Sequence, residues 1–417
     1  MNYVGSQHTI IPGASFPQGH NAIENLIPVA RISDLLLRGG EHFDFNGIRY
    51  QYPKTKLVYW AGGNPFHHHQ DLNLLMKAWQ KPDTIIAHEW CWNSLAKRAD
   101  IVLPCTTTLE RQDIAMTPRD PYVVSMSKLI EPNEQARDDY DIFAGIAKEM
   151  GVGDAFTEGR SKLDWQRWIY EQTQDRAQAA KIDMPNYETF LKDGWFKLND
   201  PVKPTVMLES FREDPVANPL DTPSGRIEIF SKTVADFRYD DCPGHPVWQE
   251  PYEWLGRVDP CWPLHLISNQ PKDKLHSQFD HGQVSRAKKV NSREPIHINP
   301  RDAAERHLKN GDVVQIKNAR GACLAGVVID KALREGVVQM STGAWYDPED
   351  PSKPNSICKH GNPNVLTRDK GTSKLGQGPT AHTCMVQVDL YQKLPPSVTA
   401  HEPPEILRIE TTKHKEK

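Results

Sequence analysis

Two glycines followed by an asparagine are the first residues whose types and spacing suit a ligand. Gly62, Gly63 and Asn64 follow a β-rich run, and Asn64 with Pro65 favours the start of a helix. Glycines let a backbone approach a ligand closely, and free N–H groups at a helix N-terminus attract phosphate. The spacing is neither a Walker A loop nor GxGxxG, so a ligand-binding turn and an ordinary strand-to-helix turn both stay open.

Other polar residues follow strands in the same way. His88 and Glu89 end a second apolar run, which places them beside the glycine turn if the two strands pair in parallel. A nucleotide-binding pair and a plain surface pair both fit these two residues. After residue 261, several polar, glycine-marked loops suit a large polar ligand: 268–278, 343–348, 361–367 and 371–378.

Metal and nucleophile chemistry are less well supported. Side chains of the consecutive histidines 67–69 point in different directions on a helix or a strand, so we do not expect them to ligate one ion. The seven cysteines include no CxxC pair, which argues against a disulfide framework and against zinc or iron–sulfur sites. Cys105, Cys323 and Cys384 lie in apolar stretches and are expected to be small buried thiols.

The elements that must position these residues follow from the hydrophobic pattern. Strands near 57–61, 84–88 and 100–104 alternate with a helix predicted over Phe66–Trp79 and a helix-compatible segment at 93–99, a pattern typical of parallel α/β architecture. From about 130 to 255 the chain is mostly helical and rich in loops. Short strands with tight turns after residue 261 predict a closed β-barrel.

Length and charge limit the classes of protein. The 417 residues exceed the roughly 250–300 at which a single core stops growing, so two or more domains are expected. A net charge of -4 lacks the basic footprint of a nucleic-acid-binding protein. No run approaches the roughly 18 apolar residues of a membrane span. The first eight residues carry neither the basic nor the apolar region of a signal peptide.

Longer phrases resemble a known family. Residues 58–73 and 99–114 are similar to molybdopterin oxidoreductases of the dimethyl sulfoxide, trimethylamine-N-oxide and biotin sulfoxide reductase group. The phrases at 274–278, 343–348, 361–367 and 372–377 follow in the same order. The resemblance extends from about Pro28 to Tyr391.

This resemblance implies a fold and a reaction. The fold would be a partial parallel-sheet α/β dinucleotide-binding domain with a helical excursion over 1–258, a six-stranded double-psi β-barrel over 259–395, and a tail over 396–417. The cofactor would be bis(molybdopterin guanine dinucleotide) molybdenum. The reaction would be oxygen-atom transfer from a sulfoxide or amine N-oxide to that molybdenum centre, completed by two electrons and two protons with loss of water.

The resemblance also assigns residues. The cofactor contacts that it implies are Gly62, Gly63, Asn64, His88, Glu89, Asp100, Ser268, His276, Ser277, Gln278, Asn364 and Gln377. Glu89 stands where the group often has aspartate.

No catalytic residue or metal ligand is expected within the chain. Relatives of this group carry their molybdenum-ligating serine in an N-terminal half, so the resemblance places that ligand upstream of Met1. We therefore expect a C-terminal part that is inactive alone and exposes cofactor-facing surface.

The partners implied are a small S-oxide or N-oxide, an electron-donor protein such as a c-type cytochrome, and a missing N-terminal half, with no nucleic acid. The periplasm is favoured as the compartment, with the cytoplasm as the alternative. Which oxide is reduced stays open. The second function class is a non-catalytic molybdopterin-dinucleotide-binding module or a subunit of a split enzyme, and the third is a nucleotide-dependent enzyme that reuses the glycine turn.

Overall fold

The computed structural model describes residues 13–117, 121–198, 206–257, 259 and 261–407. It contains two compact units, one formed by residues 25–102 with 232–417 and the other by 1–24 with 103–231. The boundary expected between 258 and 259 touches residue 258, which lies outside the described residues, as do the first 12 residues and the last ten. Met1 is one of these, so the molybdenum ligand expected upstream of Met1 also lies outside the described residues and stays a prediction.

The predicted parallel sheet belongs to the larger unit, except for the last two residues of its third strand. Its strand order is β3 (Leu57–Ala61), β4 (Thr84–Glu89) and β5 (Ile101–Pro104). β3 and β4 run parallel, with Ala61 opposite His88. The carboxyl ends of these strands therefore share one edge, as the positions of the glycine turn and of His88 predicted.

The predicted helix over Phe66–Trp79 is wrong as a single element. The structure has α2 (Pro65–His68) and α3 (Leu72–Trp79), with extended backbone at His69 between them. The His69 ring is held by Asp369, 300 residues away, with Nε2 2.9 Å from Oδ2. Asp71, with a left-handed φ of 45°, then begins α3, and its Oδ1 accepts a hydrogen bond from the Leu74 N–H at 3.1 Å.

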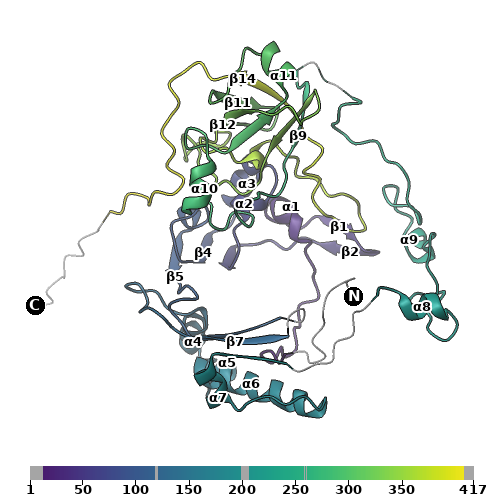
Figure 1. Cartoon of the computed structure of the whole chain (residues 1–417), viewed down its shortest axis with the longest axis vertical. Helices are drawn as coiled ribbons and strands as arrows, with labels where there is room; N and C mark the ends of the chain where they lie inside the picture. The colour runs from purple at the N-terminus through teal and green to yellow at the C-terminus, as the bar shows by residue number, and fades with distance from the viewer. Residues whose placement is uncertain (1–12, 118–120, 199–205, 258, 260, 408–417) are drawn as a thin grey trace, which may run out of the picture. The chain divides into compact units, whose positions relative to one another are not determined.

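The C-terminal part of the larger unit is a closed six-stranded barrel (Figure 1), which confirms the predicted barrel. Closure leaves no unpaired edge, and alternate residues such as Val314 and Ile316 fill its interior. One strand, β10, has no counterpart in the sequence pattern because it is four residues long and begins with proline. The strands in barrel order are β10 (Pro295–Ile298), β12 (Ala322–Ile329), β11 (Val313–Lys317), β14 (Met385–Leu390), β9 (Leu264–Ile267) and β13 (Val337–Met340).

One hydrophobic core joins the parallel sheet to the barrel. Leu75 of α3 and Ile85 of β4 belong to the same buried cluster as Val338 and Val386 of the barrel. The shared core explains why these two parts form one compact unit. The remaining elements of this unit are η1 (Val29–Arg31), α1 (Ile32–Leu37), β1 (His42–Phe45), β2 (Ile48–Gln51), η2 (Ala96–Arg98), α9 (Lys232–Asp236), α10 (Gln283–Lys288), α11 (Pro300–Glu305) and η3 (Pro363–Val365).

The second unit has its own core. Val123, Tyr170 and Phe190 pack between an antiparallel sheet and the helices that follow it. Its elements are β6 (Asp113–Met116), β7 (Tyr122–Met126), α4 (Asp139–Glu149), α5 (Gly153–Thr157), α6 (Lys162–Ala179), α7 (Tyr187–Asp193), β8 (Trp195–Lys197) and α8 (Glu209–Glu213). In the described parts of the chain, no helix has both the length and the apolar character needed to cross a membrane.

Candidate functional site

The glycine turn leaves room for a ligand. Gly62 and Gly63 have left-handed φ angles of 80° and 76°, and a Cβ added to Gly62 would meet no atom within 4 Å. Asn64 begins α2, with its Oδ1 accepting a hydrogen bond from the Phe66 N–H at 3.0 Å. Its Nδ2 is buried without a partner among the described residues. The free helix N–H expected here is thus already used, and the free donor is the Asn64 amide.

His88 and Glu89 lie beside this turn at the end of β4, as predicted. The His88 Nε2 is 2.7 Å from the Tyr59 hydroxyl oxygen, which orients the ring. Burial raises the pKa of Glu89 to about 7, although a hydrogen bond with Asn93 acts against that shift. A carboxyl group in this environment can take up a proton near neutral pH.

Asp100 is separated from these residues. It precedes β5, and its Oδ2 accepts a hydrogen bond from the backbone N–H of Ile85 at 2.8 Å. Ile85 lies near the amino end of β4, whereas His88 lies near the carboxyl end. The structure therefore places Asp100 at the opposite edge of the sheet from the glycine turn, where its carboxylate fastens neighbouring strands.

The barrel contributes a second group of predicted residues. The Ser268 side chain, just after β9, is buried and its Oγ has no partner in the described part of the chain. His276 and Gln278 are exposed and Ser277 is half-buried. All three lie on a tight turn in which the Gln278 N–H donates to the Leu275 carbonyl oxygen at 2.9 Å. This turn presents its side chains outward.

Asn364 and Gln377 hold loops in place. The Asn364 Nδ2 donates to the His67 carbonyl oxygen of α2 at 3.3 Å, so this barrel loop supports the helix that Asn64 begins. The Gln377 Nε2 donates to the Asp44 carbonyl oxygen at 3.0 Å. Both amide groups are therefore engaged in contacts within the chain.

The consecutive histidines separate, as their spacing predicted. The His67 Nε2 is 3.1 Å from the Ser94 Oγ, its ring stacks on Trp345, and burial lowers its pKa to about 3. His68 is exposed, and His69 faces Asp369. Each ring has a different environment.

Ser33, His69 and Asp369 are the residue types of a nucleophilic triad, but they do not have the geometry of a triad. The Ser33 Oγ and the Asp369 Oδ2 both approach the same ring nitrogen, Nε2, at 3.0 and 2.9 Å. A working triad uses the two ring nitrogens separately. Ser33 is also buried, and Arg31 pairs with Asp369 at 2.9 Å, so the group stabilises the fold around His69.

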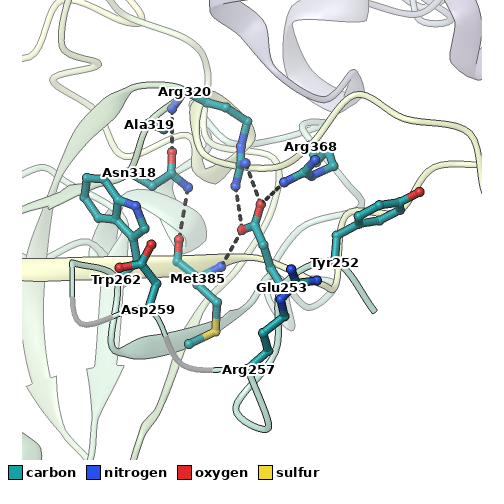
Figure 2. Close-up of a pocket in the computed structure, with 10 residues that line it drawn as sticks. All are labelled: Tyr252, Glu253, Arg257, Asp259, Trp262, Asn318, Ala319, Arg320, Arg368 and Met385. Carbon is teal, nitrogen blue, oxygen red and sulfur yellow. Dashed lines mark hydrogen bonds and ion pairs between the residues drawn. The ribbon is translucent and has the colours of Figure 1, made fainter. Parts of the chain in front are cut away.

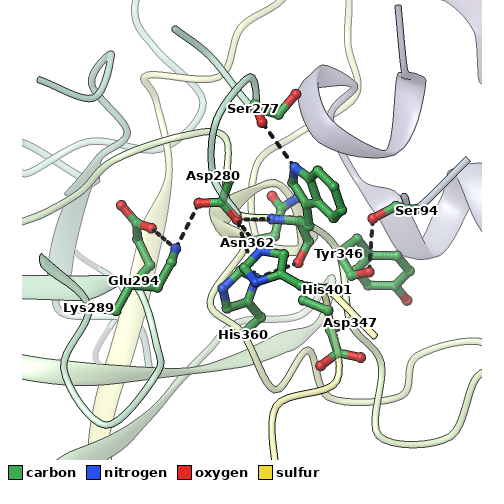
Figure 3. A network of polar contacts seen from close by, with 12 residues as sticks. Ser94, Ser277, Asp280, Lys289, Glu294, Tyr346, Asp347, His360, Asn362 and His401 are labelled. Atoms are coloured by element: carbon green, nitrogen blue, oxygen red, sulfur yellow. Dashed lines mark hydrogen bonds and ion pairs between the residues drawn. The ribbon is translucent and has the colours of Figure 1, made fainter. Parts of the chain in front are cut away.

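An ionic network, absent from the sequence-based predictions, is centred on Asp280, two residues after the turn at 276–278 (Figure 3). The Asp280 Oδ1 is 2.6 Å from the Lys274 Nζ and 2.8 Å from the Lys289 Nζ. Both ammonium groups also contact Glu294, at 2.9 and 2.7 Å. Two positive and two negative groups thus balance in a site where each side chain is at most 7 % exposed. Removing one partner would leave a buried charge unpaired.

His360 and His401 complete the surroundings of Asp280. Among the described residues, these three form the one group whose ligand atoms are close enough for a metal ion. The two ammonium groups on Asp280 already neutralise it and would repel a divalent cation. The His360 Nδ1 also lies 2.9 Å from the Trp345 carbonyl oxygen. We therefore interpret the group as part of a hydrogen-bond network and not as a metal site.

A cavity of about 610 Å³ is lined by the segment before the barrel, by residues 318–320 after β11, and by Arg368 and Met385 (Figure 2). Glu253 receives hydrogen bonds from Arg320, Arg368 and the Met385 N–H, and the Arg320 Nε also donates to the Leu366 carbonyl oxygen. Burial alone would raise the pKa of Glu253, but these bonds lower it to about 2. The cluster fastens the segment before the barrel to the loop that carries Asn364.

Two family models match this chain. Residues 44–149 match the family model described as molybdopterin oxidoreductase, and residues 264–385 match that of the molybdopterin dinucleotide binding domain. These matches contain every predicted contact, because the glycine turn, β4 and Asp100 lie in the first and the barrel loops in the second.

Curated relatives are similar over most of this chain. It is 44 % identical to the trimethylamine-N-oxide reductase of Haemophilus influenzae over 91 % of its length and 47 % of the relative's. It is equally identical to a dimethyl sulfoxide/trimethylamine N-oxide reductase and a biotin sulfoxide reductase of Cereibacter sphaeroides, over 91 % and 93 % of this chain. It covers 46 % and 52 % of those two, so it spans about half the length of these relatives.

A solved structure shares the fold. The acetylene hydratase of Pelobacter acetylenicus aligns with a TM-score of 0.65 at 17 % identity, over 87 % of this chain and 46 % of that one. At this identity the likeness concerns the fold alone.

Proposed function

Because the chain belongs to the molybdopterin oxidoreductase family, we propose that it holds a bis(molybdopterin guanine dinucleotide) molybdenum cofactor as part of an S-oxide or N-oxide reductase. The names of three relatives at 44 % identity support this class of substrate. The observation that carries the proposal is the unpaired Asn64 amide beside the open glycine turn.

The buried polar atoms fit a large polar cofactor. Asn64 Nδ2 and Ser268 Oγ are unpaired among the described residues, and a ligand's phosphate, ribose or pterin groups would satisfy them. We propose that Gly62, Gly63, Asn64, His88 and Glu89 hold one dinucleotide. Ser268, His276, Ser277 and Gln278 would contact a pterin or its phosphate. Asn364 and Gln377 would hold their loops in place through the hydrogen bonds that they donate to the His67 and Asp44 carbonyl oxygens. Asp100 is left out because it lies at the other edge of the sheet.

The family supplies the remaining parts of the proposal. When bound, such a molybdenum centre takes an oxygen atom from a sulfoxide or amine N-oxide, and two electrons and two protons restore it with release of water. The barrel would be of the double-psi type and the parallel sheet a dinucleotide-binding one. An electron donor such as a c-type cytochrome, and a segment equivalent to the rest of the relatives, would act with this chain. That segment, upstream of Met1 in the order of the relatives, would carry the molybdenum ligand.

The test distinguishes the two roles of the Asn64 side chain, in which the oxygen begins α2 and the amide nitrogen is left for a ligand. The chain is produced in a host that makes the cofactor, with and without the N-terminal half of the Haemophilus influenzae relative supplied. Asn64→Asp keeps the oxygen that begins α2 and replaces the donor by a second, buried oxygen, so we expect a folded chain of lower thermal stability with pterin content lowered at least tenfold. Asn64→Ala loses both functions and about 1 kcal/mol of stability. Asn133→Ala, at an exposed asparagine, is the matched control.

Released-pterin fluorescence and molybdenum analysis measure retention, and reduction of trimethylamine N-oxide, dimethyl sulfoxide and biotin sulfoxide measures turnover. Turnover only with the supplied half supports the reductase assignment. Pterin retention without turnover in either case would assign the non-catalytic binding role instead. Unchanged pterin content in Asn64→Asp would contradict the assignment of Asn64.

A further inference from the structure

The segment that follows the last barrel strand is firmly attached. The Thr399 N–H and hydroxyl both donate to the buried Asp347 carboxylate, at 2.7 and 2.9 Å. The Lys359 Nζ donates to the Thr399 Oγ1 at 2.8 Å, and the Lys97 Nζ donates to the carbonyl oxygens of Thr399 and Ala400 at 3.1 Å. Residues 396–402, here called the C-terminal strap, are therefore part of the packed structure, although the sequence suggested a tail from residue 396.

The strap ends by placing one imidazole against the ionic network. The His401 Nε2 lies 3.2 Å from the Asp280 Oδ2, and its ring packs edge-on to Trp345 with centroids 5.0 Å apart. The Oδ2 accepts one other hydrogen bond that the structure describes, from the Trp345 N–H at 3.2 Å. His401 thus supplies one of two close donors to the oxygen that the lysines do not contact.

The same residues hold the turn at 276–278 in place. Lys274 and Asp280 bracket this turn and pair with each other at 2.6 Å. The Trp345 indole N–H donates to the Ser277 carbonyl oxygen at 2.9 Å, which holds the tip of the turn. Asp280 and Trp345 therefore fix the base and the tip, and His401 contacts both of them.

We propose that His401, presented by the C-terminal strap, is a positioning residue that holds the 274–280 turn in its cofactor-binding conformation. The inference rests on the proposed function, because the turn carries three of the proposed pterin contacts. His401 itself faces Asp280 and Trp345 and acts on the cofactor only through the turn.

The experiment uses the full chain with two readouts. Hydrogen–deuterium exchange of the peptide spanning 274–282 reports on the turn without any cofactor, and released-pterin fluorescence reports on retention. We expect His401→Ala to speed exchange in this peptide roughly tenfold, as loss of about one hydrogen bond to a charged group produces, and to lower pterin content. His401→Gln offers an amide donor near the position of Nε2 and restores much of both. Glu405→Gln, at an exposed residue beyond the strap, changes neither.

The outcomes separate this inference from the proposed function. Unchanged exchange in a folded His401→Ala chain, with a wild type that retains pterin, overturns the inference alone. Faster exchange with undiminished pterin also overturns it, because the turn would then not need His401 to bind. A wild type that retains no pterin, even with the supplied half, overturns the proposed function and the cofactor role of His401 together. The exchange measurement then still decides whether the strap holds the turn.

Discussion

Asn64 shows how one side chain serves both the fold and a ligand. Its oxygen begins α2, and this bond fixes the amide plane so that the nitrogen is left for another acceptor. The sequence indicated both features of the position, because asparagine before proline is a local signal. It could not indicate that the Asn64 oxygen would use the Phe66 N–H, which leaves the side-chain amide as the free donor.

Glu89 gives a prediction for the pH dependence of stability. Its pKa is raised from 4.5 to about 7, so the folded chain binds more protons than the unfolded chain between these values. We expect the free energy of unfolding to fall by roughly 3 kcal/mol from this residue as the pH rises from 4.5 to 7. Glu89→Gln removes that fall, as urea unfolding of the cofactor-free chain at several pH values will show.

The matched control for Glu89 is Glu24→Gln, at an exposed carboxylate. In this variant the free energy of unfolding should fall between pH 4.5 and 7 as much as in the wild type. If the free energy of unfolding depends on pH equally in Glu89→Gln and in the wild type, Glu89 ionises normally in the folded chain.

At the scale of elements, the turn at 276–278 depends on a close approach to the loop after β13. Gly343 has φ 92°, and a Cβ placed there would lie 1.8 Å from the His276 carbonyl oxygen. We expect Gly343→Ala to displace the turn and to destabilise the chain by about 1–3 kcal/mol. Thermal unfolding measures the loss, and hydrogen–deuterium exchange of the peptide spanning 274–282, whose Ser277 accepts from the Trp345 indole, reports on the turn.

Gly376→Ala is the control for this prediction, because a Cβ there meets no atom within 4 Å and its φ is not left-handed. It should unfold at the wild-type temperature. Equal stability of the two variants would show that the turn does not pack against Gly343 in solution.

Elements whose signals are local could be predicted from the sequence, and those set by distant partners could not. β3 and β4 were predicted from apolar runs, and their shared edge follows from parallel pairing. The break at His69 was missed although Asp71, which begins α3, is an N-cap residue type, and the His69 ring is held by the distant Asp369. The network at Asp280 was missed because two of its partners, Trp345 and His401, lie 65 and 121 residues away.

At the scale of the whole molecule, clusters of buried charge should set the acid limit of stability. Burial would raise the pKa of Asp280, but His401, the two lysines and His360 lower it well below its usual range. Glu253 behaves alike, with its pKa lowered from 4.5 to about 2. Such groups stabilise the fold above their unfolded pKa, and this contribution is lost as the pH falls through the folded value.

We therefore predict that Glu253→Gln removes roughly 3 kcal/mol of pH-dependent stability between pH 4.5 and 2. Urea unfolding across that range measures it, with Glu405→Gln as the exposed control. If the free energy of unfolding of Glu253→Gln changes with pH in this range as much as that of the wild type, the contacts of Glu253 with the two arginines do not persist in solution.

Asp280 contacts Trp345, His360 and His401, which lie in later segments of the chain, and this has a consequence for synthesis. Contacts between residues far apart in sequence form late because long loops must close first. Asp280 gains its last partner only after residue 401 has been translated, although the turn that it anchors was made more than a hundred residues earlier. A nascent chain would thus carry an unfinished binding turn, and cofactor loading would follow translation of the strap.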